Sequence, residues 1–286
     1  MHGMRLMPGV VRAPRRPHGW RAPGPAPLTP ADRPELWPQA GEDLCFLTGD
    51  WRILQPTGGH RWSLDDLVTA WCAAEDRAAP PPRHIADLGC GIGAVLLMLA
   101  WRFPLARCVG VEAQAASVAL ARRSVAWNGV ADRCHVQLGD LRDADAFSAE
   151  AVFDLVTGTP PYVPRGSGGE PTRVLQAACH IEQRGGIEAY CLAAARLLAQ
   201  DGRLVVCHAA TQVVRAERAA TIAGFAIAHR LDVVPRAGKA PLFSVYVMQR
   251  APARRRPSVS ELVVRDLYGQ WTPAFRALRR EMGMPN

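Results

Sequence analysis

The sequence has almost no lysine and no closely spaced cysteine pair. Lys239 is the only lysine among 286 residues, so the net charge of +8 rests on arginine. The eight cysteines are scattered without a C-x-x-C pair, and several stand inside apolar runs. This distribution favours buried, reduced thiols in a cytosolic protein over a disulfide framework or a zinc site.

Long hydrophobic runs are also missing. No stretch approaches the roughly 18 consecutive apolar residues that a membrane-spanning helix needs. The first residues contain arginine and proline but no apolar core of a secretory signal, so neither a membrane span nor a signal peptide is predicted. We therefore expect a cytoplasmic protein, and no residue pattern indicates a bound metal.

Both ends of the chain differ from its middle. Residues 1–40 are rich in proline and arginine without any periodicity, which predicts a disordered segment, either an RNA-binding arm or an idle tail. Residues 251–286 form a basic tail, in which 258–268 and 272–282 are expected to be helical. Its arginines, Arg279 among them, could extend a basic track, because a basic balance favours a polyanionic partner.

The middle, residues 41–250, alternates between the patterns of strands and helices. Ser63-Leu64-Asp65-Asp66 is typical of a helix start, with Ser63 as the N-cap and two carboxylates in the first turn. The alternation predicts a parallel, doubly wound sheet, with strands at 84–88, 108–112, 135–138, 153–157 and 203–208, and helices at 94–103, 114–127, 186–199 and 213–223.

The last two predicted strands break this alternation. Residues 226–233 and 242–248 flank the segment VPRAGKAP, which contains no helix. They are therefore expected to pair as an antiparallel hairpin, which makes the sheet mixed.

A glycine-rich loop follows the first predicted strand of this sheet. It contains Asp87, Gly89, Gly91 and Gly93 in the order D-L-G-C-G-I-G, and a helix begins directly after it. Glycines there let the backbone approach a ligand, and the helix start presents free N–H groups. The G-x-G-x-G spacing differs from the dinucleotide fingerprint G-x-G-x-x-G. Asp87, which precedes the first glycine of this loop, suits a cationic ligand or a ligand with an ammonium group.

Acidic residues also stand at the ends of the next two strands. Glu112 ends the second strand, and Asp140 follows the third. An acid at the end of the second strand, such as Glu112, can accept hydrogen bonds from the hydroxyls of a ribose. An acid after the third strand, such as Asp140, can accept a hydrogen bond from the amine of an adenine. Each acid alone would be an ordinary loop residue or helix cap, but Asp87, Glu112 and Asp140 occupy three successive strand ends.

The fourth predicted strand stops at Gly158-Thr159-Pro160-Pro161-Tyr162. Neither proline has an N–H to continue a ladder. The segment is therefore either a simple turn or a place where bare carbonyls and an aromatic ring face a ligand.

Together these residues resemble the class I S-adenosylmethionine-dependent methyltransferases over about residues 44–250. The resemblance implies a Rossmann-like α/β fold: a seven-stranded, mostly parallel sheet with an antiparallel last strand and helices on both faces. It also implies S-adenosyl-L-methionine as the cofactor. Asp87 and the backbone of Gly89, Gly91 and Gly93 would hold its methionine part, Glu112 its ribose and Asp140 its adenine.

The same resemblance gives the proline segment a role. Amino-directed members of the family carry N-P-P-Y at this place, where the Asn oxygen and the first proline carbonyl hold the hydrogens of the target amine. Thr159, Pro160, Pro161 and Tyr162 would then be the catalytic residues, with Tyr162 stacking on the target base. Thr159 replaces the usual Asn, which leaves open a less efficient amine transfer, another target atom or cofactor binding with little catalysis.

The flanking segments GHRWSLDDLVTAW and GFAIAHRLDVVPRAGKAPLFSVYVMQR resemble bacterial tRNA adenine-N6 methyltransferases that act on a valine tRNA. This implies a tRNA partner. Among the residues of the first segment, Trp62 is expected in the core, although Trp62 or Arg61 could instead contact the cofactor. The alternative is a release-factor glutamine methyltransferase, which shares N-P-P-Y and a helix start like GGIEAY. That group carries a helical N-terminal domain, which the proline-rich residues 1–40 are not expected to form.

Overall fold

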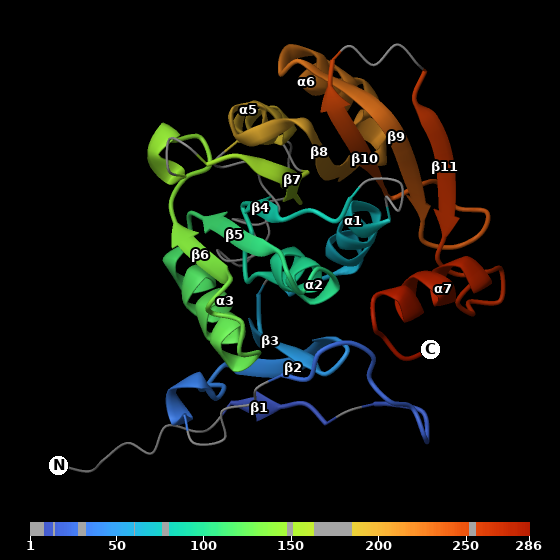
Figure 1. The fold of residues 1–286 in the computed structure, drawn as a ribbon. Helices are drawn as coiled ribbons and strands as arrows, with labels where there is room; N and C mark the ends of the chain where they lie inside the picture. The colour runs from blue at the N-terminus through green and yellow to red at the C-terminus, as the bar shows by residue number, and fades with distance from the viewer. Residues whose placement is uncertain are drawn as a thin grey trace.

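An eight-stranded sheet runs through the middle of the protein in the order β11-β9-β10-β8-β7-β4-β5-β6 (Figure 1). The computed structural model describes residues 9–13, 15–27, 33–59, 61–75, 80–147, 151–162, 185–251 and 256–286. The strands of this sheet are β4 (His84–Leu88), β5 (Arg107–Glu112), β6 (Cys134–Leu138), β7 (Phe153–Gly158), β8 (Leu198–Ala209), β9 (Phe225–Val234), β10 (Phe243–Arg250) and β11 (Ser258–Val263).

Strand directions confirm the mixed α/β sheet, but the expected count of seven strands is wrong, because β11 adds an eighth strand in parallel to β9. The neighbours from β6 to β8 pair in parallel, whereas β10 is antiparallel to both β8 and β9. Because the chain enters β4, β5, β6, β7 and β8 in the same direction, their carboxyl ends meet at one edge. That edge carries the glycine loop and the end of β7.

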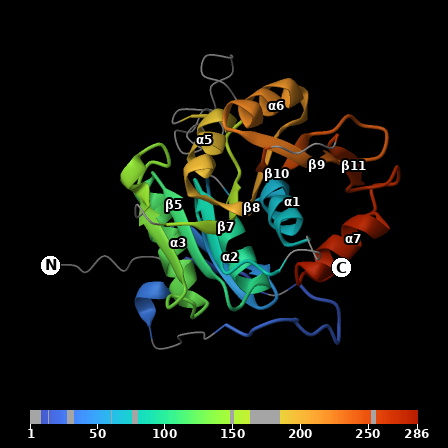
Figure 2. The ribbon, with the colours of Figure 1, turned by 45° about the horizontal axis from the view of Figure 1, so that its top comes forward.

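Helices cover both faces of the sheet (Figure 2). The helices α1 (Leu64–Ala74), α2 (Ala94–Arg102) and α3 (Ala115–Trp127) lie on one face, and α5 (Ile187–Leu197) and α6 (Val213–Ile222) on the other. Side chains along β4 alternate between two apolar clusters, because successive residues of a strand point to opposite faces. Ile85 belongs to one cluster and Ala86 to the other.

A second, three-stranded sheet is formed by β1 (Val10–Val11), β2 (Glu42–Thr48) and β3 (Trp51–Pro56). It packs against α3, where Ser124 Oγ accepts a 2.9 Å hydrogen bond from the Leu54 N–H. The expectation of disorder over residues 1–40 is therefore wrong for β1, which pairs in parallel with β2, and for the 3-10 helix Pro34–Leu36.

The C-terminal tail joins the fold rather than extending from it. Residues 258–263 form β11, parallel to β9, so the predicted helix over 258–268 is wrong. The second predicted helix is present as α7 (Pro273–Glu281), and Thr272 Oγ1 accepts from the Phe275 N–H at 3.2 Å. Thr48 Oγ1 donates to the Met282 carbonyl at 2.6 Å, which ties the end of the chain to β2.

Seven cysteines lie in the described residues as free thiols, and six of these are buried. The eighth, Cys179, lies outside the described residues. Among the helices that the structure describes, none combines the length and apolarity that a bilayer crossing requires. The division into a main domain over 41–250 and two tails stays a prediction.

Candidate functional site

The glycine loop connects β4 to α2 and adopts a conformation that favours glycine. Gly89, Gly91 and Gly93 have φ angles of +57°, +54° and +86°. L side chains rarely adopt such angles, whereas glycine does so without a steric penalty. At Gly91, a Cβ atom would meet no other heavy atom within 4 Å. The backbone at Gly91 therefore faces open space, where a ligand can approach it.

That open space belongs to a cavity of about 500 Å³ at the carboxyl edge of the sheet. Its wall comes from the glycine loop, from the end of β5, from the segment after β7 and from the start of α1. A cavity of this size suits a cofactor or a small-molecule substrate. The fold thus joins at one place three motifs that stand far apart in the sequence.

Glu112 lines this cavity from the end of β5 and is only 6% exposed. Its Oε2 accepts the Gly91 N–H at 3.0 Å, and its Oε1 accepts the Gln114 N–H at 2.7 Å. Each carboxylate oxygen has two lone-pair directions, so both can accept a further hydrogen bond. Glu112 therefore supports the glycine loop and also presents acceptors to a ligand with hydroxyl groups.

Asp87 lies buried near the end of β4, behind the residues that line the cavity. Thr157 Oγ1 donates to Asp87 Oδ1 at 2.8 Å. Burial raises the pKa of Asp87 to about 7, although the Thr157 hydrogen bond opposes this shift. A group that titrates near neutral pH can respond to a cationic ligand by losing its proton.

Asp140 follows β6, and its carboxylate pairs with a neighbouring arginine. Both of its oxygens accept from the Arg142 guanidinium, at 2.9 Å and 2.7 Å. Asp140 is not among the described residues that line the cavity. Its role toward an adenine stays a prediction, and it would require Asp140 to bond the base in addition to Arg142.

The segment after β7 lines the cavity with all four of its residues: Thr159, Pro160, Pro161 and Tyr162. Gly158 precedes them and packs against Tyr190 of α5, because a Cβ there would lie 2.5 Å from Tyr190 Cδ1. Tyr190 also covers Gly89, whose added Cβ would lie 2.1 Å from the tyrosine hydroxyl. One aromatic ring thus holds the glycine loop and the proline segment together.

Tyr162 is fixed in the cavity wall. Its hydroxyl donates to Asp65 Oδ2 at 3.0 Å and lies 3.0 Å from Cys207 Sγ. The ring meets His208 edge to face, with centroids 5.7 Å apart. Desolvation by the surrounding protein raises the pKa of Tyr162 well above its usual value, so the phenol stays neutral. This arrangement leaves Tyr162 as an oriented aromatic surface rather than a proton carrier.

Asp65 and Asp66 also line the cavity. From the sequence they were expected only as carboxylates in the first turn of a helix, and not as site residues. Asp66 is 6% exposed, and its Oδ2 accepts the Ser63 N–H at 2.9 Å. Its Oδ1 accepts from Thr159 Oγ1 at 3.4 Å. Burial raises the pKa of Asp66 well above the ordinary range, and the nearby charge of Asp65 adds to the shift. The fold places this carboxyl beside the threonine that replaces the expected Asn.

No sequence signal could have shown this contact, because Asp66 and Thr159 are 93 residues apart. The fold brings them together by stacking α1 beside the end of β7. The sequence did suggest Arg61 and Trp62 as possible ligand contacts, and both line the cavity. Within the described part of the chain, no group of His, Cys, Asp and Glu side chains could hold a metal ion.

Comparison with protein families gives a match to a methyltransferase domain over residues 85–186. This range starts in β4 and includes the glycine loop, Glu112, Asp140 and the proline segment. The match therefore contains every predicted site residue.

The chain is also similar to named enzymes. One is the tRNA1(Val) (adenine(37)-N6)-methyltransferase of Porphyromonas gingivalis, 28% identical over 219 residues, which are 73% of this chain and 82% of the relative. Another is the release factor glutamine methyltransferase of Chlorobaculum tepidum, 33% identical over 121 residues, 40% of this chain and 39% of the relative.

Among solved structures, a predicted O-methyltransferase from Agrobacterium tumefaciens has a similar fold. Its TM-score is 0.60 at 21% identity, and the match covers 77% of this chain and 98% of that one. At this identity the likeness concerns the fold alone.

Proposed function

We propose that this chain, which is a class I S-adenosylmethionine-dependent methyltransferase, methylates the exocyclic amine of an adenine in tRNA. The observation that carries the proposal is the cavity in which the glycine loop, Glu112 and the segment from Thr159 to Tyr162 meet. The similarity to the Porphyromonas gingivalis tRNA enzyme, which extends over most of both chains, supports adenine as the target. We expect the enzyme to act in the cytoplasm.

S-adenosyl-L-methionine is the cofactor, and when bound it supplies a methyl group on a positively charged sulfur. The cavity fits such a molecule. The open face of Gly91 lets the backbone approach it, and Glu112 has acceptor positions left for ribose hydroxyls. Asp87, behind the wall, would supply a negative charge near the ammonium group once it is ionised.

The residues after β7 would orient the target amine. Thr159 and Pro160 line the cavity, and the Thr159 hydroxyl and the Pro160 carbonyl would each accept one amine hydrogen. Two such bonds fix the nitrogen with its lone pair directed into the cavity, which lowers the barrier by positioning. The ring of Tyr162, held by Asp65 and Cys207, offers a flat surface for the unstacked base.

Asp66 would compensate for the threonine. A threonine hydroxyl lacks the fixed amide oxygen of Asn, but here it donates to Asp66, which leaves its lone pairs directed elsewhere. Once ionised, the Asp66 carboxyl would also accept the proton that the amine must lose after methylation. A raised pKa makes that acceptor more basic than a surface carboxylate.

The experiment is a methyl-transfer assay with labelled S-adenosyl-L-methionine on total tRNA and on total cell protein in parallel. We expect label in tRNA and none above background in protein. Thr159→Asn, assayed beside the wild type, measures whether the threonine limits the rate. Faster transfer by the variant would show that it does, and an equal rate would support the compensation by Asp66.

The second candidate function is glutamine methylation of a release factor. It is favoured by the similarity to the Chlorobaculum tepidum enzyme, which covers less than half of either chain. Label confined to a protein of release-factor size would select this function over the tRNA proposal.

A further inference from the structure

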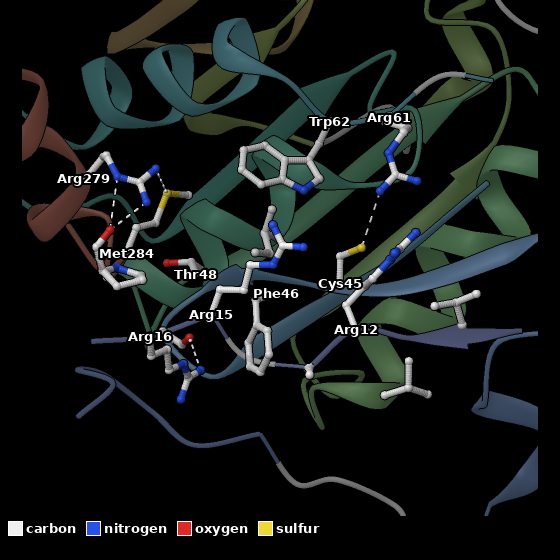
Figure 3. A pocket seen from close by; sticks show the side chains of 17 residues that line it. Arg12, Arg15, Arg16, Cys45, Phe46, Thr48, Arg61, Trp62, Arg279 and Met284 are labelled. Atoms are coloured by element: carbon white, nitrogen blue, oxygen red, sulfur yellow. Dashed lines mark hydrogen bonds between the residues drawn. The ribbon is translucent and has the colours of Figure 1, made fainter. Parts of the chain in front are cut away.

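A second cavity, of about 630 Å³, lies next to the first. The two share Arg61 and Trp62 in their walls. The rest of this second wall comes from the N-terminal segment, from β2, from Arg279 of α7 and from the residues after α7, as Figure 3 shows. We call this cavity the arginine groove.

Arginine dominates the charge of the groove. Five arginines line it, and among the described residues their ion pairs with carboxylates involve only Asp43 and Asp50. The lining arginines are Arg12, Arg15, Arg16, Arg61 and Arg279. The groove therefore carries a clear excess of positive charge. Residues from near both ends of the chain contribute these arginines.

Four of the five arginines have a partner that holds them, namely Arg12, Arg16, Arg61 and Arg279, whereas Arg15 is exposed. Arg12 and Arg61 each reach the buried Asp43 at 2.8 Å. The N-terminal segment is fixed by the pairing of β1 with β2 and by a 3.0 Å hydrogen bond from the Arg12 N–H to the Leu44 carbonyl. A groove of fixed guanidinium groups needs little ordering when an anion binds.

Two aromatic side chains, Phe46 and Trp62, line the groove beside these arginines. Phe46 lines the groove with Arg16 stacked at 4.4 Å from its centroid and Arg52 at 3.9 Å. Trp62 stands at the junction with the first cavity. Phe46 thus orients two arginines, while Trp62 is the ring on which a base could stack. Arginines that contact phosphates, together with such a ring, are the combination that binds single-stranded nucleic acid.

We propose that the arginine groove binds the phosphate backbone of the RNA strand next to the target adenine. This rests on the proposed function, because the shared wall of Arg61 and Trp62 would let a strand continue from the groove to the amine site. Arginine suits the task, since its guanidinium pairs with phosphate through two parallel hydrogen bonds. The groove would then provide affinity for the strand, while the first cavity selects the base.

The test compares two double variants. Arg15→Ala/Arg16→Ala removes two groove charges, whereas Arg107→Ala/Arg218→Ala removes two exposed arginines at the start of β5 and on α6, outside the groove. We expect the groove variant to lose about tenfold or more in tRNA affinity and about two units of the salt slope, one for each lost phosphate contact. Its S-adenosyl-L-methionine affinity and its rate at saturating tRNA should stay those of the wild type.

The variant Arg15→Lys/Arg16→Lys controls for misfolding of the N-terminal segment. It keeps both positive charges, so it should keep most of the salt slope. Equal tRNA affinity in the groove and control variants would overturn the proposal, and methylation of tRNA by the wild type would show that the proposed function survives. A wild type that methylates protein instead, with a protein KM raised only in the groove variant, would replace RNA with an acidic protein surface as the occupant. No methylation of tRNA by the wild type would reject the proposed function itself.

Discussion

At the scale of single residues, the site depends on glycines that let Tyr190 pack. Its ring contacts both Gly89 and Gly158, and neither position has space for a Cβ. Gly158 lies in extended backbone at the end of β7, so an alanine there would be unfavourable through its contacts, mainly with Tyr190 and also with the Leu88 carbonyl at 3.3 Å. The two glycines therefore set how closely α5 approaches the site.

We expect Gly158→Ala to lower the free energy of unfolding by about 1–3 kcal/mol, because the added methyl group would overpack the site against Tyr190. Urea denaturation measures this loss. Gly224→Ala is the control for a substitution that meets no neighbour, although its φ of +77° adds backbone strain. If Tyr190→Leu did not reduce the cost of Gly158→Ala, the contact with Tyr190 would not be its cause.

Asp66 is proposed to act in the reaction in two ways. It would orient the Thr159 hydroxyl, and it would accept the proton that the methylated amine loses. Asp66→Asn should lower kcat by about 10²-fold, the usual contribution of a proton acceptor, with tRNA KM little changed. The wild-type rate should rise with pH as Asp66 ionises, and the variant should lose that rise. A variant with the wild-type pH profile would remove Asp66 from the mechanism.

Asp87 predicts a dependence of stability on pH. Burial raises the pKa of Asp87 to about 7 in the folded protein, whereas an aspartate in the unfolded chain has its ordinary pKa of 3.8. The folded state therefore holds the proton more tightly, and the stability that this gives is present below about pH 4 and is lost as the pH rises to about 7. The loss is at most about 4 kcal/mol.

Asp87→Asn should remove this part of the pH dependence, because Asn stays neutral and can keep the hydrogen bond from Thr157. Thermal unfolding of both proteins without cofactor, at about pH 5 and about pH 8, measures the difference. Curves that fall in parallel for both proteins would contradict the raised pKa of Asp87.

At the scale of secondary-structure elements, the C-terminal tail was the hardest part to predict. The segment SVSELVV has apolar residues at Val259, Leu262 and Val263, a spacing that a helix can also present. In the structure it is β11, because β9 offers an open edge and both Ser258 and Ser260 reach the His229 ring, at 2.8 Å and 3.1 Å. Tertiary pairing decides such short segments, and periodicity alone does not.

Elements with long and regular patterns were predicted well. The strand His84–Leu88 has its predicted bounds, and α3 ends at Asn128-Gly129, where Gly129 takes a φ of +70°. The hairpin of β2 and β3 was missed because its strands carry few alternating polar residues. For the site, the sequence predicted the glycine loop and the proline segment, but it could not show that Arg142 pairs with Asp140.

The helix α7 should matter for stability although it stands at the end of the chain. Leu278 is 1% exposed there and belongs to the same apolar cluster as Trp51. Leu278→Ala should lower the free energy of unfolding by about 2–5 kcal/mol, the range for deleting a buried leucine side chain. The exposed Arg280→Ala on the same helix should change it by less than about 0.5 kcal/mol. Equal effects in urea denaturation would mean that α7 does not pack as described.

At the scale of the whole molecule, a segment near each end of the chain reaches the turn after β2 at Gly49. Arg16 donates to the Gly49 carbonyl at 3.2 Å, and the Gly49 N–H donates to the Gly283 carbonyl at 2.9 Å. Residues from both segments that the sequence set apart as tails line the arginine groove, which shares Arg61 and Trp62 with the first cavity (Figure 3). Binding of the substrate strand and transfer to its base would then occur on one continuous surface.

The most direct test of this account is nucleoside mass spectrometry of tRNA after incubation with the enzyme and S-adenosyl-L-methionine. We predict N6-methyladenosine in tRNA treated with the wild type, and much less with Glu112→Ala or Tyr162→Ala, which remove the proposed ribose acceptor and the stacking ring. Methyl groups on another nucleoside, or on protein alone, would contradict the claim that this cavity methylates the adenine amine of tRNA.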